Sequence, residues 1–280
     1  MELLTSTVGH AFLQTLIIMF ELFGIIIILG LLLGYLRNLS VKNILSTIGF
    51  NGIIFTCPGV FIHELSHYIF AKLFRYNIRK VRFFRPIKGA DDGVLGYVNF
   101  SYNKNSIIQK IGLFFVGFAP IFGGTLSLFL AMKFLLKDTY HILLNNIQAS
   151  LNNINILSTD FFTFQINIFK QMLISMFSLS NIHTLKFWIF IYIAICISAH
   201  IALSDADLKG SYSGLITIFI VFFVLNIFSG INISFSLIAT YNIIIVLLLN
   251  TLLLFSLLHL IFTILLKNSI LFIKQMAVLI

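Results

Sequence analysis

Three residues in the run FIHELSHYIF could do metal chemistry: His63, Glu64 and His67. On a helix, residues four apart lie about 40° apart on one face, so both imidazoles can reach one ion while Glu64 stands beside it. Neutral histidines bind Zn²⁺ at about 2.0–2.1 Å, and a neighbouring carboxylate can take a proton from activated water. This HExxH spacing predicts a zinc-dependent hydrolase with two histidine ligands and Glu64 as general base. The alternative is three polar residues whose hydrogen bonds are satisfied by neighbouring helices.

The composition places these residues in a membrane protein. Of 280 residues, 59% are hydrophobic and 10% are charged, whereas an ordinary soluble domain is about 45–50% apolar and about 25% charged. We therefore expect an all-α, polytopic protein of the lipid bilayer. Two cysteines are too few for a disulfide-stapled secreted module. The formal charge of +9 is attributed to topology and lipid headgroups, and nucleic-acid binding is not expected.

Six stretches are apolar enough to be transmembrane helices, which need about 20 residues. They are residues 11–36, 46–71, 108–135, 186–205, 213–230 and 241–266. The Asn-rich segment 138–185 has apolar residues at helical spacing, which favours a helix lying in the membrane interface, with a seventh span near 161–179 as the alternative. We expect one transmembrane domain over residues 1–280.

The basic residues predict how this domain is oriented. Nine of the 18 Lys and Arg residues lie between Lys72 and Lys110, and the positive-inside rule places that loop in the cytoplasm. Both termini are then cytoplasmic, and the second and fourth spans run in the same direction. His67 and Asp207 each lie about 20 residues into these spans, so the two side chains are expected at similar depth, toward the cytoplasmic side.

A catalytic zinc site needs a third protein ligand and keeps a fourth position open. The metzincin pattern is absent, because Phe70 and Leu73 stand where it requires Gly and His. No Glu follows Glu64, so a downstream Glu ligand is excluded. The aspartates at 91 and 92 fall in a predicted turn, and those at 138 and 160 fall across the membrane. The candidates that remain, in the run SAHIALSDADLKG, are Asp207, Asp205 and His200.

Helical geometry favours Asp207 among these candidates. If the fourth span continues as a helix through the run, His200, Ser204 and Asp207 share a face, whereas Asp205 points about 160° away from Asp207. The alternative is a helix end where carboxylates meet water.

Residues 80–102 predict a β-hairpin directly after the second span. Apolar residues alternate with basic ones at 80–83, the turn-prone GADDG follows at 89–93, and residues 96–102 alternate again. A basic cytoplasmic loop without regular structure is the alternative.

Two proline and glycine features are expected to shape the surroundings of the HExxH run. Pro58 removes a backbone hydrogen bond and displaces the carbonyl of Ile54, so the second span should kink just before His63 and admit water. The small residues of GFAPIFGG, at 117–124, would let the third span approach the site closely, although plain helix packing explains them equally well.

HELSH in an early span, an aspartate motif in a later one and a hairpin directly after the first together resemble the site-2 protease family of intramembrane zinc metalloproteases. The resemblance covers residues 50–125 and 195–210. In that family the third ligand lies in an Asp-Gly motif often preceded by Asn-Pro, whereas here Asp207 precedes Leu208, Lys209 and Gly210. The resemblance implies zinc bound by His63, His67 and Asp207, and substrates that are membrane-anchored regulators or signal-peptide remnants.

The resemblance also implies a role for the hairpin, because the family's membrane-associated hairpin is thought to engage substrate as an extended strand. The substrate-binding residues expected on this basis are Gly96, Tyr97, Val98 and Asn99. The leading hypothesis is a zinc endopeptidase that cleaves a membrane-spanning protein or peptide. The alternative is a membrane carrier or metal-binding protein whose histidines and Glu64 line an ion path without hydrolysis.

Overall fold

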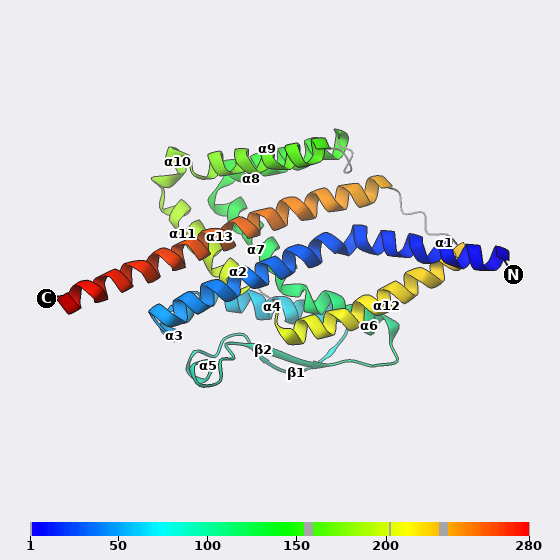
Figure 1. The fold of residues 1–280 in the computed structure, drawn as a ribbon, viewed down its shortest axis with the longest axis horizontal. Helices are drawn as coiled ribbons and strands as arrows, with labels where there is room; N and C mark the ends of the chain where they lie inside the picture. The colour runs from blue at the N-terminus through cyan, green and yellow to red at the C-terminus, as the bar shows by residue number, and fades with distance from the viewer. Residues whose placement is uncertain (1, 154–158, 202, 230–234, 280) are drawn as a thin grey trace.

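The computed structural model describes residues 2–153, 159–201, 203–229 and 235–279, and it is mostly helical (Figure 1). The elements up to the sheet are α1 (Glu2–Met19), the π-helical turn η1 (Phe20–Gly24), α2 (Ile25–Thr47), α3 (Phe50–Phe55) and α4 (Cys57–Leu73). The sheet region holds β1 (Asn77–Arg82), α5 (Pro86–Asp92) and β2 (Tyr97–Ser101). The remaining helices are α6 (Ile107–Gly117), α7 (Ala119–Leu135), α8 (Lys137–Asn153), α9 (Thr159–Met176), α10 (Leu179–Ile182), α11 (Leu185–His200), α12 (Asp205–Ser229) and α13 (Phe235–Leu279).

Apolar helices long enough to cross a membrane confirm the expectation of a mostly helical membrane protein. Among the described residues, three helical stretches meet the length and composition of a span: Val8–Thr47, Asp205–Phe228 and Ile244–Ala277. The pair α6 and α7, bent by 55° at Phe118, makes a fourth if it is one broken span. The helix α11 is apolar but shorter. Three of the six expected spans, 11–36, 213–230 and 241–266, therefore correspond to such stretches, and 108–135 is a fourth if the bent pair is one span. Residue 230 lies outside the described residues.

The expected second span, 46–71, is divided rather than continuous. The helix α2 runs on to Thr47, Gly49 adopts a φ of 72°, and the short α3 ends at Phe55, with Thr56 between it and α4. Pro58 lies in the first turn of α4, where backbone N–H groups have no acceptor within the helix. The N–H that proline lacks therefore costs no helical hydrogen bond. The expected kink just before His63 is thus a full break at Thr56, and the HExxH run starts in the second turn of a new helix.

The helices α8 and α9 pack against each other, and α8 also packs against α7 and α13. Figure 1 shows the pair side by side at one edge of the bundle. The interfacial helix expected for segment 138–185 and its alternative, a seventh span near 161–179, stay predictions. Residues 154–158 of that segment lie outside the described residues.

The strands β1 and β2 pair in antiparallel fashion, which confirms the predicted hairpin. Val81 pairs with Val98 and Arg82 with Tyr97. The connection is not the expected tight turn, because α5 occupies it and Gly93 ends that helix in the left-handed conformation.

Polar contacts fix the return of this connection toward β2. The backbone N–H of Val94 donates to Asp92 Oδ1 at 2.9 Å, and Arg85 Nη2 donates to Asp92 Oδ2 at 2.9 Å. These two hydrogen bonds hold the pKa of the Asp92 carboxyl below its usual value, and the bond from Val94 has the larger effect. The Arg85 N–H also donates to the carbonyl of Leu95. As a result residues 93–96 lead directly into β2.

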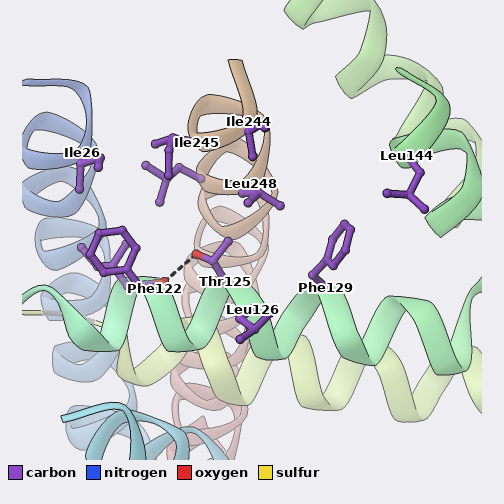
Figure 2. A pocket seen from close by; sticks show the side chains of 11 residues that line it. Ile26, Phe122, Thr125, Leu126, Phe129, Leu144, Ile244, Ile245 and Leu248 are labelled. Atoms are coloured by element: carbon purple, nitrogen blue, oxygen red, sulfur yellow. Dashed lines mark hydrogen bonds between the residues drawn. The ribbon is translucent and has the colours of Figure 1, made fainter. Parts of the chain in front are cut away.

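The apolar core lies where α2, α7, α11 and α13 meet. Its fully buried large side chains include Ile26, Leu33, Ile121, Leu128, Phe190 and Phe255. A cavity of about 350 Å³ opens beside this core, and Figure 2 shows Phe122, Thr125 and Phe129 of α7 facing Ile245 and Leu248 of α13 across it. The Thr125 hydroxyl donates to the carbonyl of Ile121. None of the described residues that line the cavity has a titratable side chain, so it offers no acid, base or metal ligand.

Candidate metal centre

The two imidazoles of the HExxH run meet on one face of α4. His63 Nε2 and His67 Nε2 lie 3.2 Å apart. Each ring is held from its other nitrogen by a backbone carbonyl: His63 Nδ1 bonds to the carbonyl of His200, and His67 Nδ1 to that of Val116, both at 2.8 Å. These carbonyls belong to the ends of α11 and α6, so three helices fix the two rings.

These hydrogen bonds determine which ring nitrogens carry protons. A carbonyl oxygen only accepts hydrogen bonds, so each Nδ1 must be the donor and each neutral ring keeps a lone pair on Nε2. Two unprotonated nitrogens cannot hydrogen-bond to each other, so the close Nε2 pair is repulsive without a cation between them. Metal-ligating histidines typically donate their other N–H in this way.

A carboxylate completes the group. Asp207 Oδ1 lies 3.4 Å from His67 Nε2, and one ligand atom from each of His63, His67 and Asp207 lies within 4.8 Å of the others. Two ligands at about 2.0–2.1 Å from a tetrahedral ion would be about 3.3 Å apart. The spacings of 3.2 Å and 3.4 Å therefore fit a zinc ion, and the nitrogen and oxygen donors are of the type that zinc accepts.

Asp207 is positioned by the start of α12 and not by continuation of α11. The condition that the fourth span continues as a helix through this run is not met, because α11 ends at His200 and α12 begins at Asp205. Ser204 is the cap: its backbone N–H and its hydroxyl both donate to Asp207 Oδ2, at 2.9 Å and 2.6 Å, and the Asp207 N–H donates back to the Ser204 hydroxyl. This reciprocal capping box leaves Oδ1 free to face the imidazoles.

Sequence reasoning missed this cap although its signal is present. Ser204 and Asp207 have the S-x-x-[DE] spacing that marks a helix start. The other two candidates, Asp205 and the His200 ring, are not part of the group of His63, His67 and Asp207. Asp205 is exposed to solvent, and the His200 ring bonds through Nε2 to the Thr56 hydroxyl at 2.7 Å. His200 contributes its backbone carbonyl, which holds His63, and not its ring.

Glycines let the helices that carry these groups approach closely. A Cβ on Gly59 of α4 would overlap the backbone carbonyl of Cys196 in α11, which is what brings the end of α11 next to His63. A Cβ on Gly117 would overlap Ser211 and come within 2.6 Å of the carbonyl of Asp207. Gly117 therefore lets α6 pack directly against α12 beside Asp207, a contact that both close approach to the site and plain helix packing would produce.

Glu64 lines a cavity of about 230 Å³ together with His63, His200, Ser204 and Arg37. Its side chain is 8% exposed. The cavity's other wall is the return of the hairpin, residues 93–96. A Cβ on Gly96 would come within 2.6 Å of Glu64 Cγ, so only a glycine allows the hairpin to pass this close to the carboxylate.

The four residues expected to bind substrate lie at different distances from this cavity. Gly96 lines it, whereas the next three residues do not. The Tyr97 ring lies under Lys80 and Arg85 at 5.9 Å and 5.4 Å. Val98 pairs with Val81 in the sheet, and Asn99 is exposed. Arg37 is a charged lining residue that sequence reasoning did not single out, because no sequence pattern relates this position in α2 to the cavity next to α4.

Comparison with known proteins adds no assignment: no family model, curated protein or solved structure matches the chain. The case for a metal centre therefore stands on the geometry of His63, His67 and Asp207 alone.

Proposed function

We propose that this chain is a zinc-dependent endopeptidase of the membrane, which hydrolyses a peptide bond in or beside a membrane-spanning segment of its substrate. The observation that supports the proposal most strongly is the pair of imidazoles whose lone pairs converge, 3.2 Å apart, beside a carboxylate. His63, His67 and Asp207 would hold the ion. The excess of basic residues between Lys72 and Lys110 favours a site toward the cytoplasmic side.

The residues around the cavity supply the other parts of a hydrolase. When bound, zinc polarises a carbonyl and makes water acidic enough to be deprotonated near neutral pH. Glu64 is next to His63 in the sequence and lies outside the ligand group. It would accept the proton of the attacking water and return it to the leaving amine.

The hairpin offers a way to hold an unfolded substrate. A membrane-spanning helix hides its carbonyls in its own hydrogen bonds, so it must unwind locally before cleavage. In the two-stranded sheet, β1 and β2 each have one unpaired edge among the described strands. An extended substrate segment could pair with the edge of β2 near Gly96, and its backbone would then lie close to Glu64. This keeps Gly96, Tyr97, Val98 and Asn99 as the proposed substrate contacts.

Removal of the metal tests the proposal. We expect the purified protein in lipid vesicles to cleave a model transmembrane peptide, to lose all measurable cleavage when a chelator removes its zinc, and to recover after one equivalent of zinc is added. Metal analysis of the same samples confirms that removal is complete. Cleavage by metal-free protein would refute the proposal, and bound zinc without cleavage of any peptide would favour the carrier.

A further inference from the structure

Arg37 is a charged residue inside a candidate membrane span, and it lines the same cavity as His63 and Glu64. It belongs to α2, within the stretch Val8–Thr47, and lies ten residues before the end of that helix. Charged side chains within spans are costly and usually face a partner or a functional cavity. For the guanidinium of Arg37, that cavity is the one it lines next to His63 and Glu64.

No carboxylate in the described part of the chain pairs with Arg37. The ion pairs found there are His67–Asp207 and Arg85–Asp92. The guanidinium makes a hydrogen bond from Nη1 to the neighbouring Asn38 side chain at 3.2 Å. Its Nε is buried and has no hydrogen-bond partner among the described residues. A buried donor without a partner is unfavourable, and an acceptor atom of a ligand in the cavity would satisfy it.

The donors of Arg37 and the size of the cavity favour a carboxylate side chain as the acceptor. Guanidinium donors match a carboxylate in a bidentate arrangement, with Nε and one Nη as a typical donor pair. At about 230 Å³ the cavity is smaller than the about 300–1,000 Å³ of pockets for drug-sized ligands. It therefore suits a single side chain better than a lipid headgroup. One substrate side chain next to the scissile bond would reach it while the backbone lies along the hairpin.

The hairpin adds a second, independent indication of an acidic ligand. Its exposed basic residues are Arg75, Arg79, Lys80, Arg82 and Lys88. Asp91 and Asp92 are the acidic residues of the same segment, and Asp92 is already paired with Arg85. The hairpin that would receive the substrate is therefore strongly positive as a whole, through β1 and α5 rather than through β2 itself, and this charge attracts acidic segments and repels basic ones.

We propose that Arg37 is a specificity-determining residue that binds the carboxylate of an Asp or Glu side chain in the substrate, so that the preferred substrates carry an acidic residue beside the cleavage site. That this binding leads to cleavage rests on the proposed function, but the binding itself does not. It can therefore be measured in a protein that cannot hydrolyse its ligand.

The experiment measures peptide binding to the full-length, zinc-loaded Glu64→Gln variant in phosphatidylcholine vesicles. The probes are three peptides with the same apolar transmembrane segment, followed by an extended stretch that carries Glu, Gln or Lys. We expect the Glu peptide to bind at least about tenfold more tightly than the Gln peptide, the effect of one charged hydrogen bond. Adding Arg37→Gln should abolish this difference, and adding Arg37→Glu should make the Lys peptide the tightest ligand.

The matched control is Lys42→Gln, which removes an exposed cation from the same helix and should leave the preference for Glu intact. Zinc content shows whether each variant is folded, and the reversal with Arg37→Glu cannot arise from misfolding. Equal binding of the Glu and Gln peptides would overturn the proposal. So would binding of phosphatidylglycerol that depends on Arg37 in place of peptide discrimination, because the ligand would then be a lipid phosphate. A preference for Glu in a protein whose wild type cleaves no peptide would support the Arg37 site and refute the hydrolase.

Discussion

Replacing Glu64 with Gln is expected to lower cleavage of a transmembrane peptide by about 10²–10⁴-fold, the usual contribution of a general base. Gln has nearly the same size and shape, so it should keep the close contact with the hairpin at Gly96. Its amide cannot accept the proton from water. Because Glu64 is not one of the three grouped ligands, the variant should still bind one zinc ion.

Turnover and zinc content of the same preparation test this prediction together. The control is Glu21→Gln, the same chemical change in η1, a segment that does not line the 230 Å³ cavity. It should cleave at the wild-type rate. A Glu64→Gln protein that cleaves as fast as the wild type, in preparations whose metal-free form does not cleave, would show that Glu64 is not the base.

The second large effect is expected at Asp207. Asp207→Asn replaces a charged ligand oxygen with a neutral one, and we expect it to weaken zinc binding by more than the about 10–100-fold typical for loss of a supporting residue. Ser204→Ala removes the hydroxyl that holds Asp207 Oδ2 at 2.6 Å and should fall within that smaller range.

Competition with a zinc-binding dye gives these affinities. The matched control is Asp205→Asn, which makes the same change two residues away at an exposed position and should leave zinc affinity unchanged. If instead Asp205→Asn weakened zinc binding and Asp207→Asn did not, the third ligand would have been assigned to the wrong carboxylate.

Local patterns predicted the parts of this protein that local physics determines. The four-residue spacing of His63 and His67 was enough to place both rings on one face of a helix, since helical geometry fixes that relation. Alternation over 80–102 was enough to predict two paired strands, because strand residues alternate between faces. The choice of Asp207 over Asp205 agrees with the observed geometry, although the unbroken helix used to argue for it does not exist.

The parts that depend on packing between distant segments could not be predicted. The hydropathy of residues 46–71 predicted one continuous span, because the number of apolar residues carries no information about the breaks at Gly49 and Thr56. After these breaks α4 runs as a separate helix, and Arg37 of α2 lines the same cavity as His63 of α4. The carbonyls that orient the two imidazoles come from Val116 and His200. Any residue type can supply such a backbone group, so no sequence motif marks it.

X-ray absorption at the zinc edge of the purified, full-length protein tests the central claim most directly, because it reports the ligands of the ion without reference to activity. The account predicts one zinc per chain, with nitrogen and oxygen ligands at about 2.0–2.1 Å and outer-shell scattering from two imidazoles. The Asp207→Asn variant should keep the imidazole signal with fewer or longer oxygen contacts. Zinc bound by water alone, or through the sulfur of Cys57 or Cys196, would contradict the account.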